Sequence, residues 1–224
     1  MKAKSIAYVR FSPHEHDPER MGQLVEAYRE VFAATPWHEW LKCAKCDKYW
    51  GKKDLPSLTS IGFKHHRKPL VDFWTRDGVV KDLKHEITPA SSCWLALLGT
   101  TVVGFTWGYP LNLKKLEKKL KLPVSARFHE LFGSGESIAY QDELGVLDEF
   151  RGQKIAKTLV AKRHDDFIKR GLKIGVVRTR QSPEPSMTYL WYTGKLGYET
   201  LATYTDGRVV LARQLKGLKE LLHA

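Results

Sequence analysis

The stretch YQDELGVLDEFRGQKIAKTLVA, residues 140–161, decides the fold of this 224-residue chain. Residues 138–146 read as a β-strand, and the polar segment 148–152 then breaks the pattern and ends in a glycine that lets backbone approach a ligand closely. Apolar residues next recur at helical spacing, at Ile155, Leu159, Val160, Phe167 and Ile168, up to a helix end near Gly171. The stretch is therefore predicted to form a strand, a turn and a helix.

The turn has the properties of an anion site. The first turn of a helix has free backbone N–H groups and the positive end of the helix dipole, so it attracts negative charge. Arg151, Lys154 and Lys157 add positive side chains at this point. A pyrophosphate would fit there, although the string taken alone is equally consistent with the charged start of an ordinary helix.

A second pattern, LWYTGKLGYE at residues 190–199, follows further along the chain. The two patterns, in this order, resemble the two markers of the GNAT superfamily of acyl-CoA N-acyltransferases across about residues 90–213. The first marker is R/Q-x-x-G-x-G/A after a splayed strand, and the second is a tyrosine-bearing helix before K-L-G-F/Y-E. Two departures are visible: Lys154 stands where the family usually has glycine, and Tyr192 lies five residues before Gly197 rather than four.

The resemblance implies an α/β fold with a central, mostly antiparallel twisted sheet flanked by helices, forming one domain over residues 1–224. It implies that an acetyl group passes from acetyl-CoA directly to an amine in a ternary complex, without a covalent enzyme intermediate. It also implies that the backbone of Leu144 and Val146 pairs with the pantetheine arm of the cofactor. The pyrophosphate is expected on the turn, held by Arg151, Gly152, Gln153, Lys154, Ile155, Ala156 and Lys157.

The same resemblance suggests the catalytic residues. Glu143 or Asp142 would take the proton of the amine, and Tyr192 would protonate the departing thiolate; such acid–base help is worth roughly 10²–10⁴-fold in rate. Because side chains alternate along a strand, Asp142 and Glu143 are predicted to face opposite sides of the sheet. The alternative for Glu143 is a solvated or salt-bridged strand carboxylate, and the alternative for Tyr192 is a packed aromatic ring.

The rest of the chain fits a mixed sheet with helices. Predicted strands cover 5–9, 93–98, 102–109, 173–178, 200–205 and 208–214, and predicted helices cover 18–33 and 186–195. Residues 111–134 form a helical insert, in which the lysine-rich run 114–121 is expected to turn a basic face to water. Residues 34–70 are irregular and rich in Trp, His, Lys and Cys. Trp37, Trp40, Trp50 and Trp74 could line an acceptor cleft or pack in the core.

Composition limits the class of protein. Apolar content of 42% and seven tryptophans describe a folded globule, and no window approaches the roughly 20 apolar residues of a membrane span. The first residues lack the apolar region of a secretory signal, and three cysteines make no disulfide framework, so a reducing, cytoplasmic compartment is predicted. The net charge of +12 favours an anionic partner such as nucleic acid, a membrane surface or a phosphorylated cofactor. The oligomeric state stays open, with a dimer among the alternatives.

Cys43 and Cys46 have the C-x₂-C spacing of a metal or redox site. Zinc needs four ligands. Those beyond the two cysteines would have to come from His38, Asp47, His65, His66 or Cys93. Neighbouring lysines would instead favour reactive thiolates. Structural zinc, plain thiols and redox chemistry all remain open.

Two other functions also remain open. Residues 34–70 could form a metal-clipped knuckle in a basic nucleic-acid-binding module, or the fold could bind acyl-CoA as a sensor without catalysis. The sequence does not identify the acceptor amine, because a fold resemblance does not determine a substrate.

Overall fold

The computed structural model describes residues 5–15, 17–46, 48–134 and 137–223. Its largest element is a seven-stranded sheet in the order β1-β7-β8-β9-β10-β12-β11. The strands are β1 (Ile6–Arg10), β7 (Ser92–Leu98), β8 (Thr101–Leu111), β9 (Ile138–Val146), β10 (Ile174–Arg180), β11 (Glu199–Thr203) and β12 (Arg208–Gln214). Neighbours pair antiparallel except β9 and β10, which run parallel. The predicted mixed, mostly antiparallel sheet is confirmed.

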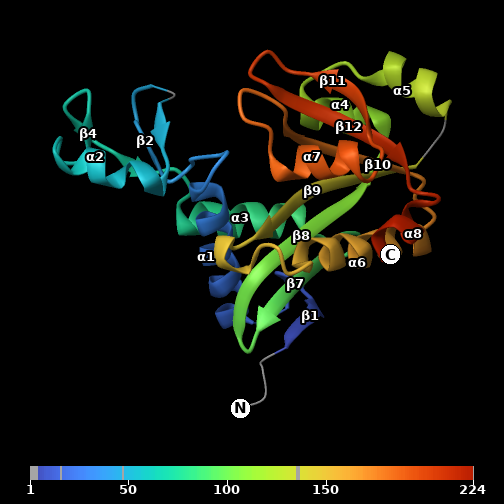
Figure 1. Cartoon of the computed structure of the whole chain (residues 1–224), viewed down its shortest axis with the longest axis horizontal. Coiled ribbons are helices and arrows are strands. Elements are labelled where there is room, and N and C mark those ends of the chain that lie inside the picture. The colour runs from blue at the N-terminus through green and yellow to red at the C-terminus, as the bar shows by residue number, and fades with distance from the viewer. Residues whose placement is uncertain (1–4, 16, 47, 135–136, 224) are drawn as a thin grey trace.

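Helices cover both faces of this sheet (Figure 1). They are α1 (Pro18–Ala33), α3 (Arg76–Glu86), α4 (Leu113–Leu120), α5 (Ser125–Phe132), α6 (Ile155–Lys169), α7 (Met187–Gly194) and α8 (Leu218–His223). One face is packed by α1 and α3 over β7 and β8, and by α4 and α5 over the later strands. The opposite face is packed by α6, with α7 and α8 beside it. No helix in the described ranges combines the length and the apolar character that a membrane crossing needs.

Local sequence explains the ends of the long helices near the site. Asp17 caps α1 by accepting a hydrogen bond from the amide of Arg20 at 2.8 Å, and Pro18 occupies the first turn, where a missing N–H costs nothing. Ser186 caps α7 in the same way through the amide of Tyr189 at 3.0 Å. These caps determine where the helices that flank the site begin.

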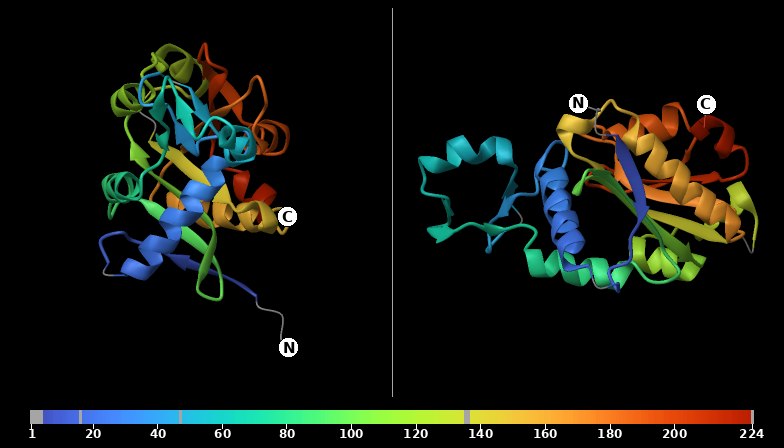
Figure 2. Two further views of the ribbon diagram at one scale, coloured as in Figure 1. Left: turned by 90° about the vertical axis from the view of Figure 1, so that its left-hand side faces the viewer. Right: turned by 90° about the horizontal axis from the view of Figure 1, so that it is seen from below.

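The segment expected to be irregular contains several short elements. They are β2 (Leu41–Lys42), β3 (Tyr49–Trp50), a 3₁₀ turn (Lys52–Asp54), α2 (Leu55–Thr59), β4 (Lys64–His65), β5 (Lys68–Pro69) and β6 (Val71–Asp72). They make a three-stranded sheet, β3-β2-β6, and the hairpin β4-β5. We call residues 40–73 the small lobe, because it projects from the large sheet and its helices (Figure 2). Helix α3 follows the lobe and was not predicted.

Candidate functional site

The turn between β9 and α6 begins with a short 3₁₀ helix, Asp148–Phe150, and reverses direction at two left-handed residues. Gly152 has φ 78° and Lys154 has φ 62°, ψ 11°. A residue with a side chain pays about 1–2 kcal/mol for this conformation. Lys154 therefore takes the backbone shape that glycine supplies in the family pattern, and it adds a positive charge at the entrance of α6.

The turn borders an open groove and has backbone amides without a protein acceptor. Among the hydrogen bonds of the described residues, none uses the backbone N–H groups of residues 153–157. The groove has a volume of about 400 Å³ and runs from the end of β9 across the turn to α7. Its walls include all the cofactor residues predicted from sequence except Gln153: Leu144, Val146, Arg151, Gly152, Lys154, Ile155, Ala156 and Lys157.

Strands β9 and β10 separate beside this groove and form a wedge. They pair only from Ile138 to Gln141 on β9 and from Ile174 to Val177 on β10, although both strands continue further. The amide of Leu147 donates a hydrogen bond to β8 at 3.0 Å. Backbone N–H groups along a strand point alternately to its two neighbouring sides, so the amides of Leu144 and Val146 point away from β8, toward the wedge. The predicted backbone contacts therefore lie at an unpaired strand edge.

The acidic pair on β9, Asp142 and Glu143, is not oriented as predicted. The pairing of β8 with β9 shifts register where Trp107 faces Glu143 and Gly108 faces Gln141, so Asp142 is an extra, bulged residue. Tyr140 packs on the α4–α5 side and Leu144 on the α6 side, which a regular strand would not allow for residues four apart. The bulge turns Asp142 and Glu143 to the same face, and the expectation of opposite faces was wrong.

Asp142 is held by two donors. Its carboxylate accepts hydrogen bonds from the Tyr109 hydroxyl at 2.7 Å and from the Lys119 ammonium at 2.9 Å. Lys119 also bonds Glu86 at 3.0 Å. Lys119 thus departs from the expected solvated face of 114–121 and ties α4 to β9 and α3.

Glu143 has no such ammonium partner among the described residues. Burial raises the pKa of Glu143 well above its ordinary value, and the negative charges of Asp142 and Glu86 raise it further. Burial likewise raises the pKa of Glu86 to about 7 and that of Glu39 to about 7. A carboxyl with a pKa near neutrality is suited to accept and release a proton at physiological pH.

Tyr192 lies on α7 at the closed end of the wedge and is fully buried. Its hydroxyl accepts a hydrogen bond from Nη2 of Arg163 at 3.0 Å and donates one to Oε1 of Gln141 at 3.0 Å. Burial raises the pKa of Tyr192, while the Arg163 charge acts in the opposite direction. Tyr192, Glu143 and Arg163 line the same small cavity, together with Trp37 and Arg178.

Arg163 is buried among neutral acceptors. Besides Tyr192, its guanidinium donates to Gln141 at 2.6 Å, to the carbonyl of Glu143 at 2.9 Å and to that of Trp107 at 3.2 Å. It thereby holds the bulge of β9 against α6.

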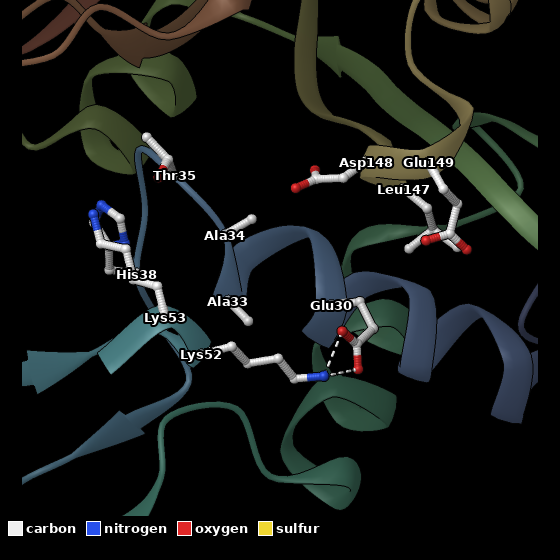
Figure 3. Close-up of a pocket in the computed structure, with 10 residues that line it drawn as sticks. All are labelled: Glu30, Ala33, Ala34, Thr35, His38, Lys52, Lys53, Leu147, Asp148 and Glu149. Carbon is white, nitrogen blue, oxygen red and sulfur yellow. Dashed lines mark hydrogen bonds and ion pairs between the residues drawn. The ribbon is translucent and has the colours of Figure 1, made fainter. Parts of the chain in front are cut away.

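A second, more polar cavity of about 510 Å³ lies between the end of α1 and the segment that follows β9 (Figure 3). Lys52, Lys53 and His38 line it on the side of the small lobe. Glu30 bonds Lys52 at 2.6 Å, and Asp148 and Glu149 lie across from them. Thr35 borders both this cavity and the groove of the turn, so the two spaces adjoin.

The small lobe brings together the two cysteines and two of the predicted histidines. One ligand atom from each of Cys43, Cys46, His65 and His66 lies within 4.8 Å of the others. Of the other predicted ligands, Cys93 is buried in the core on β7 and His38 lines the polar cavity. Asp47 lies outside the described residues.

Sequence reasoning missed several residues of the site. Glu39 and Glu86 lie in segments for which no element was predicted. Arg163 could have been noticed, because it stands between Leu159 and Phe167 on the apolar stripe of α6. A charged residue on a buried stripe indicates a polar network within the core.

The comparisons with known proteins agree with this geometry. A model of the Acetyltransferase (GNAT) family matches residues 59–191, more than half of the chain. The chain therefore belongs to the GNAT family of acetyltransferases, as its two markers suggested. No curated protein sequence matches it.

Solved structures with the same fold include two acetyltransferases and a protein named Ard1. The PaiA N-acetyltransferase of Thermoplasma acidophilum, in complex with coenzyme A, is 13% identical with a TM-score of 0.54, covering 94% of this chain and 99% of that chain. The aminoglycoside 6'-N-acetyltransferase of Enterococcus faecium is 11% identical with a TM-score of 0.54, covering 93% and 97%. Ard1 of Thermoplasma volcanium is 12% identical with a TM-score of 0.52, covering 93% and 97%. Because these sequence identities are low, the structural similarity establishes the fold of this chain and nothing further.

Proposed function

We propose that this protein transfers an acetyl group from acetyl-CoA to an amine of an acceptor, in one step within a ternary complex. The observation that carries the proposal is the wedge between β9 and β10. It joins the groove of free amides to the cavity shared by Glu143 and Tyr192. A thioester placed in the wedge would have its phosphates at one end and the reacting carbonyl at the other.

The cofactor would be bound largely by backbone. The amides of residues 153–157 would hold the pyrophosphate, with Arg151, Lys154 and Lys157 adding charge. The unpaired amides of Leu144 and Val146 would bond the pantetheine arm as a neighbouring strand does. An amide directed at the thioester oxygen would also stabilise the negative charge that develops there.

The proton transfers would use the two residues at the end of the wedge. Glu143 would take the proton from the attacking ammonium group, since its raised pKa makes it a stronger base than an exposed carboxylate. The amine nitrogen would then form a bond to the carbonyl carbon as the carbon–sulfur bond breaks. Tyr192 would give its proton to the departing sulfur, with the Arg163 charge stabilising the phenolate that remains. The second proton of the newly bonded nitrogen would then pass to this phenolate, which leaves a neutral amide and restores the tyrosine.

The acceptor would approach from the side of α1 and the small lobe. Phe32, near the end of α1, lines the cavity that holds Glu143, as does Trp37. Ala33 and Ala34, at the same end of α1, line the polar cavity of Figure 3. The negative charges of Asp142, Glu86 and Glu39 act on Glu143 and exceed the opposing positive charge of Arg178, so this end of the site favours a protonated amine over an anion.

The test measures thermal unfolding with and without acetyl-CoA, together with CoA release over a panel of amines. A ligand at about 100 times its dissociation constant adds roughly 2.7 kcal/mol, a rise of several degrees for a chain of this size. Gly152→Glu places a side chain and a negative charge in the turn and should abolish the rise.

Gly133→Glu is the matched control. Gly133 has φ 77°, as Gly152 has 78°, and a Cβ added at either position would meet no other atom within 4 Å, so both variants add the same charge at a glycine of positive φ without a steric clash. The control should keep the rise. Binding without release of CoA across the panel would point to a sensor. No rise at all, with salt-dependent oligonucleotide binding, would replace the proposal by the nucleic-acid function.

A further inference from the structure

The small lobe has too little apolar core to account for its fold. Its strands are two residues long, and α2 has five residues. Among the described residues of the lobe, only Cys43 and Leu58 are buried apolar side chains. Segments this short usually need a disulfide, a metal or a partner, because burial alone cannot offset the conformational entropy lost on folding.

The cluster of Cys43, Cys46, His65 and His66 lies where such a crosslink would act. The two cysteines belong to the turn between β2 and β3, and the two histidines belong to the hairpin β4-β5 on the other side of α2. The Cys46 sulfur lies 3.7 Å from Nδ1 of His65. Zinc bonds of about 2.3 Å to sulfur and 2.0 Å to nitrogen place neighbouring tetrahedral ligands at about this separation.

The cysteine turn is shaped to hold a thiolate. The amide of Lys45 donates to the Cys43 sulfur at 3.3 Å, which turns the backbone around that atom. The lobe also carries eight lysines and arginines against three aspartates in residues 40–73. Backbone donors and positive surroundings both stabilise a negatively charged sulfur, which is the form that binds metal.

The histidine turn has strained backbone. His66 has φ 52° and Arg67 has φ 59°, the two left-handed positions of a tight hairpin turn that usually holds Asn-Gly. Residues with side chains are rare at such positions unless a functional demand maintains them. Here the turn directs two adjacent histidines toward the same point, and their ring centroids lie 4.1 Å apart.

We infer that Cys43, Cys46, His65 and His66 bind one zinc ion as a structural crosslink of the small lobe. Four protein ligands leave no open position for a reacting molecule, which is the arrangement of structural rather than catalytic zinc. Two thiolates and two imidazoles suit zinc better than magnesium or calcium, which prefer oxygen ligands. Binding releases the thiol protons, and the two thiolates balance the charge of the ion.

The zinc would also fix one wall of the polar cavity. Lys52 and Lys53 belong to the lobe and follow β3, and Lys52 reaches Glu30 on α1. Loss of the ion is therefore expected to loosen the acceptor side of the site. The groove that would hold the cofactor is built by β9, α6 and α7 and should be unaffected.

The test is metal analysis of full-length protein purified without a histidine tag. We expect about one zinc per chain in the wild type and a loss of most of it in Cys46→Ser and in His65→Asn. Cys93→Ala and His85→Asn are matched controls outside the cluster and should keep the zinc. Cobalt exchanged into the site should give the absorption of a tetrahedral centre with thiolate ligands.

A second measurement does not depend on activity. Limited trypsin digestion should cut the small lobe of the two cluster variants, or of chelator-treated wild type, while the sheet of β7 to β12 stays intact. Wild type with no zinc and a Cys43–Cys46 disulfide would overturn the inference. Equal zinc in all variants would overturn it as well, because the metal would then bind elsewhere.

Discussion

The Nη2 atom of Arg163 lies 3.0 Å from the hydroxyl of Tyr192, in a part of the core where both side chains are fully buried. Neither has a carboxylate hydrogen-bonded to it among the described residues, and Gln141 completes the network as a neutral acceptor. A guanidinium that faces only neutral groups keeps its positive charge available to a phenolate or a thiolate that forms nearby. The Arg163 charge therefore offsets part of the cost that burial imposes on loss of the Tyr192 proton.

Tyr192→Phe should lower the maximal rate by about 10²-fold when chemistry limits turnover, because the departing thiolate loses its acid. The affinity for acetyl-CoA should change little, since the groove is intact. Tyr198→Phe is the matched control, because the Tyr198 hydroxyl is also buried and accepts from Gln141 at 2.6 Å but does not line the cavity with Glu143. Equal losses in both variants would indicate a packing role for Tyr192.

Glu143→Gln should reduce kcat/KM by roughly 10²–10⁴-fold and should also change its pH dependence. Burial raises the pKa of Glu143, so the wild-type carboxyl is protonated at low pH and becomes a base only as pH rises through that raised value. Wild-type kcat/KM should therefore climb with pH, and this limb should disappear in the variant. A limb that survives unchanged would transfer the base role to Glu86 or Glu39, and Glu220→Gln serves as an exposed control away from the site.

Glu39→Gln should stabilise the protein in a pH-dependent way. Burial raises the pKa of Glu39 to about 7 in the folded state, above the ordinary value of about 4.3 in the unfolded chain. The wild type therefore loses stability as pH rises from about 4 to about 7, because only the unfolded state readily gives up the proton. The variant should gain on the order of 1–3 kcal/mol at pH 8 and almost nothing at pH 4.

The measurement is urea unfolding of both proteins at several pH values. The amide of Gln can still accept the 2.9 Å hydrogen bond from Nε1 of Trp74, so the substitution isolates the charge. A gain that is the same at pH 4 and pH 8 would show that titration of Glu39 is not its cause.

The parts of the site that could be predicted are those in which neighbouring residues of the sequence form a recognisable pattern. The turn from Arg151 to Ala156 was identified because its glycine, charges and following helix are contiguous in sequence. The bulge at Asp142 was not, since Gln141, Asp142 and Glu143 are all polar and give no alternation from which to detect an inserted residue. The network of Arg163 joins β8, β9 and α7 through contacts far apart in the chain, which no local pattern encodes.

The structure of the small lobe was also difficult to predict from local sequence patterns. Short apolar runs are needed to recognise strands and helices, and residues 40–73 contain few of them. The C-x₂-C spacing drew attention to Cys43 and Cys46, but it did not select His65 and His66 among five proposed ligands. The left-handed turn at His66, which brings the pair into position, has no sequence signature of its own because it lacks the usual Asn-Gly.

The last prediction concerns Lys154, because different substitutions can separate the effect of its backbone conformation from the effect of its charge. Lys154→Gly removes the left-handed strain and should stabilise the protein by roughly 0.5 to 1 kcal/mol, after the extra entropy of glycine in the unfolded chain is counted. Lys154→Ala keeps the strain and should leave stability nearly unchanged.

Both variants lose the ammonium group, so both should bind acetyl-CoA a few-fold more weakly at low salt, an effect that shrinks as salt is raised. Thermal unfolding and calorimetric titration separate the two effects, and Lys157→Ala controls for the loss of charge without strain. Tighter binding by Lys154→Gly would mean that closeness of the backbone matters more to the cofactor than the lysine charge.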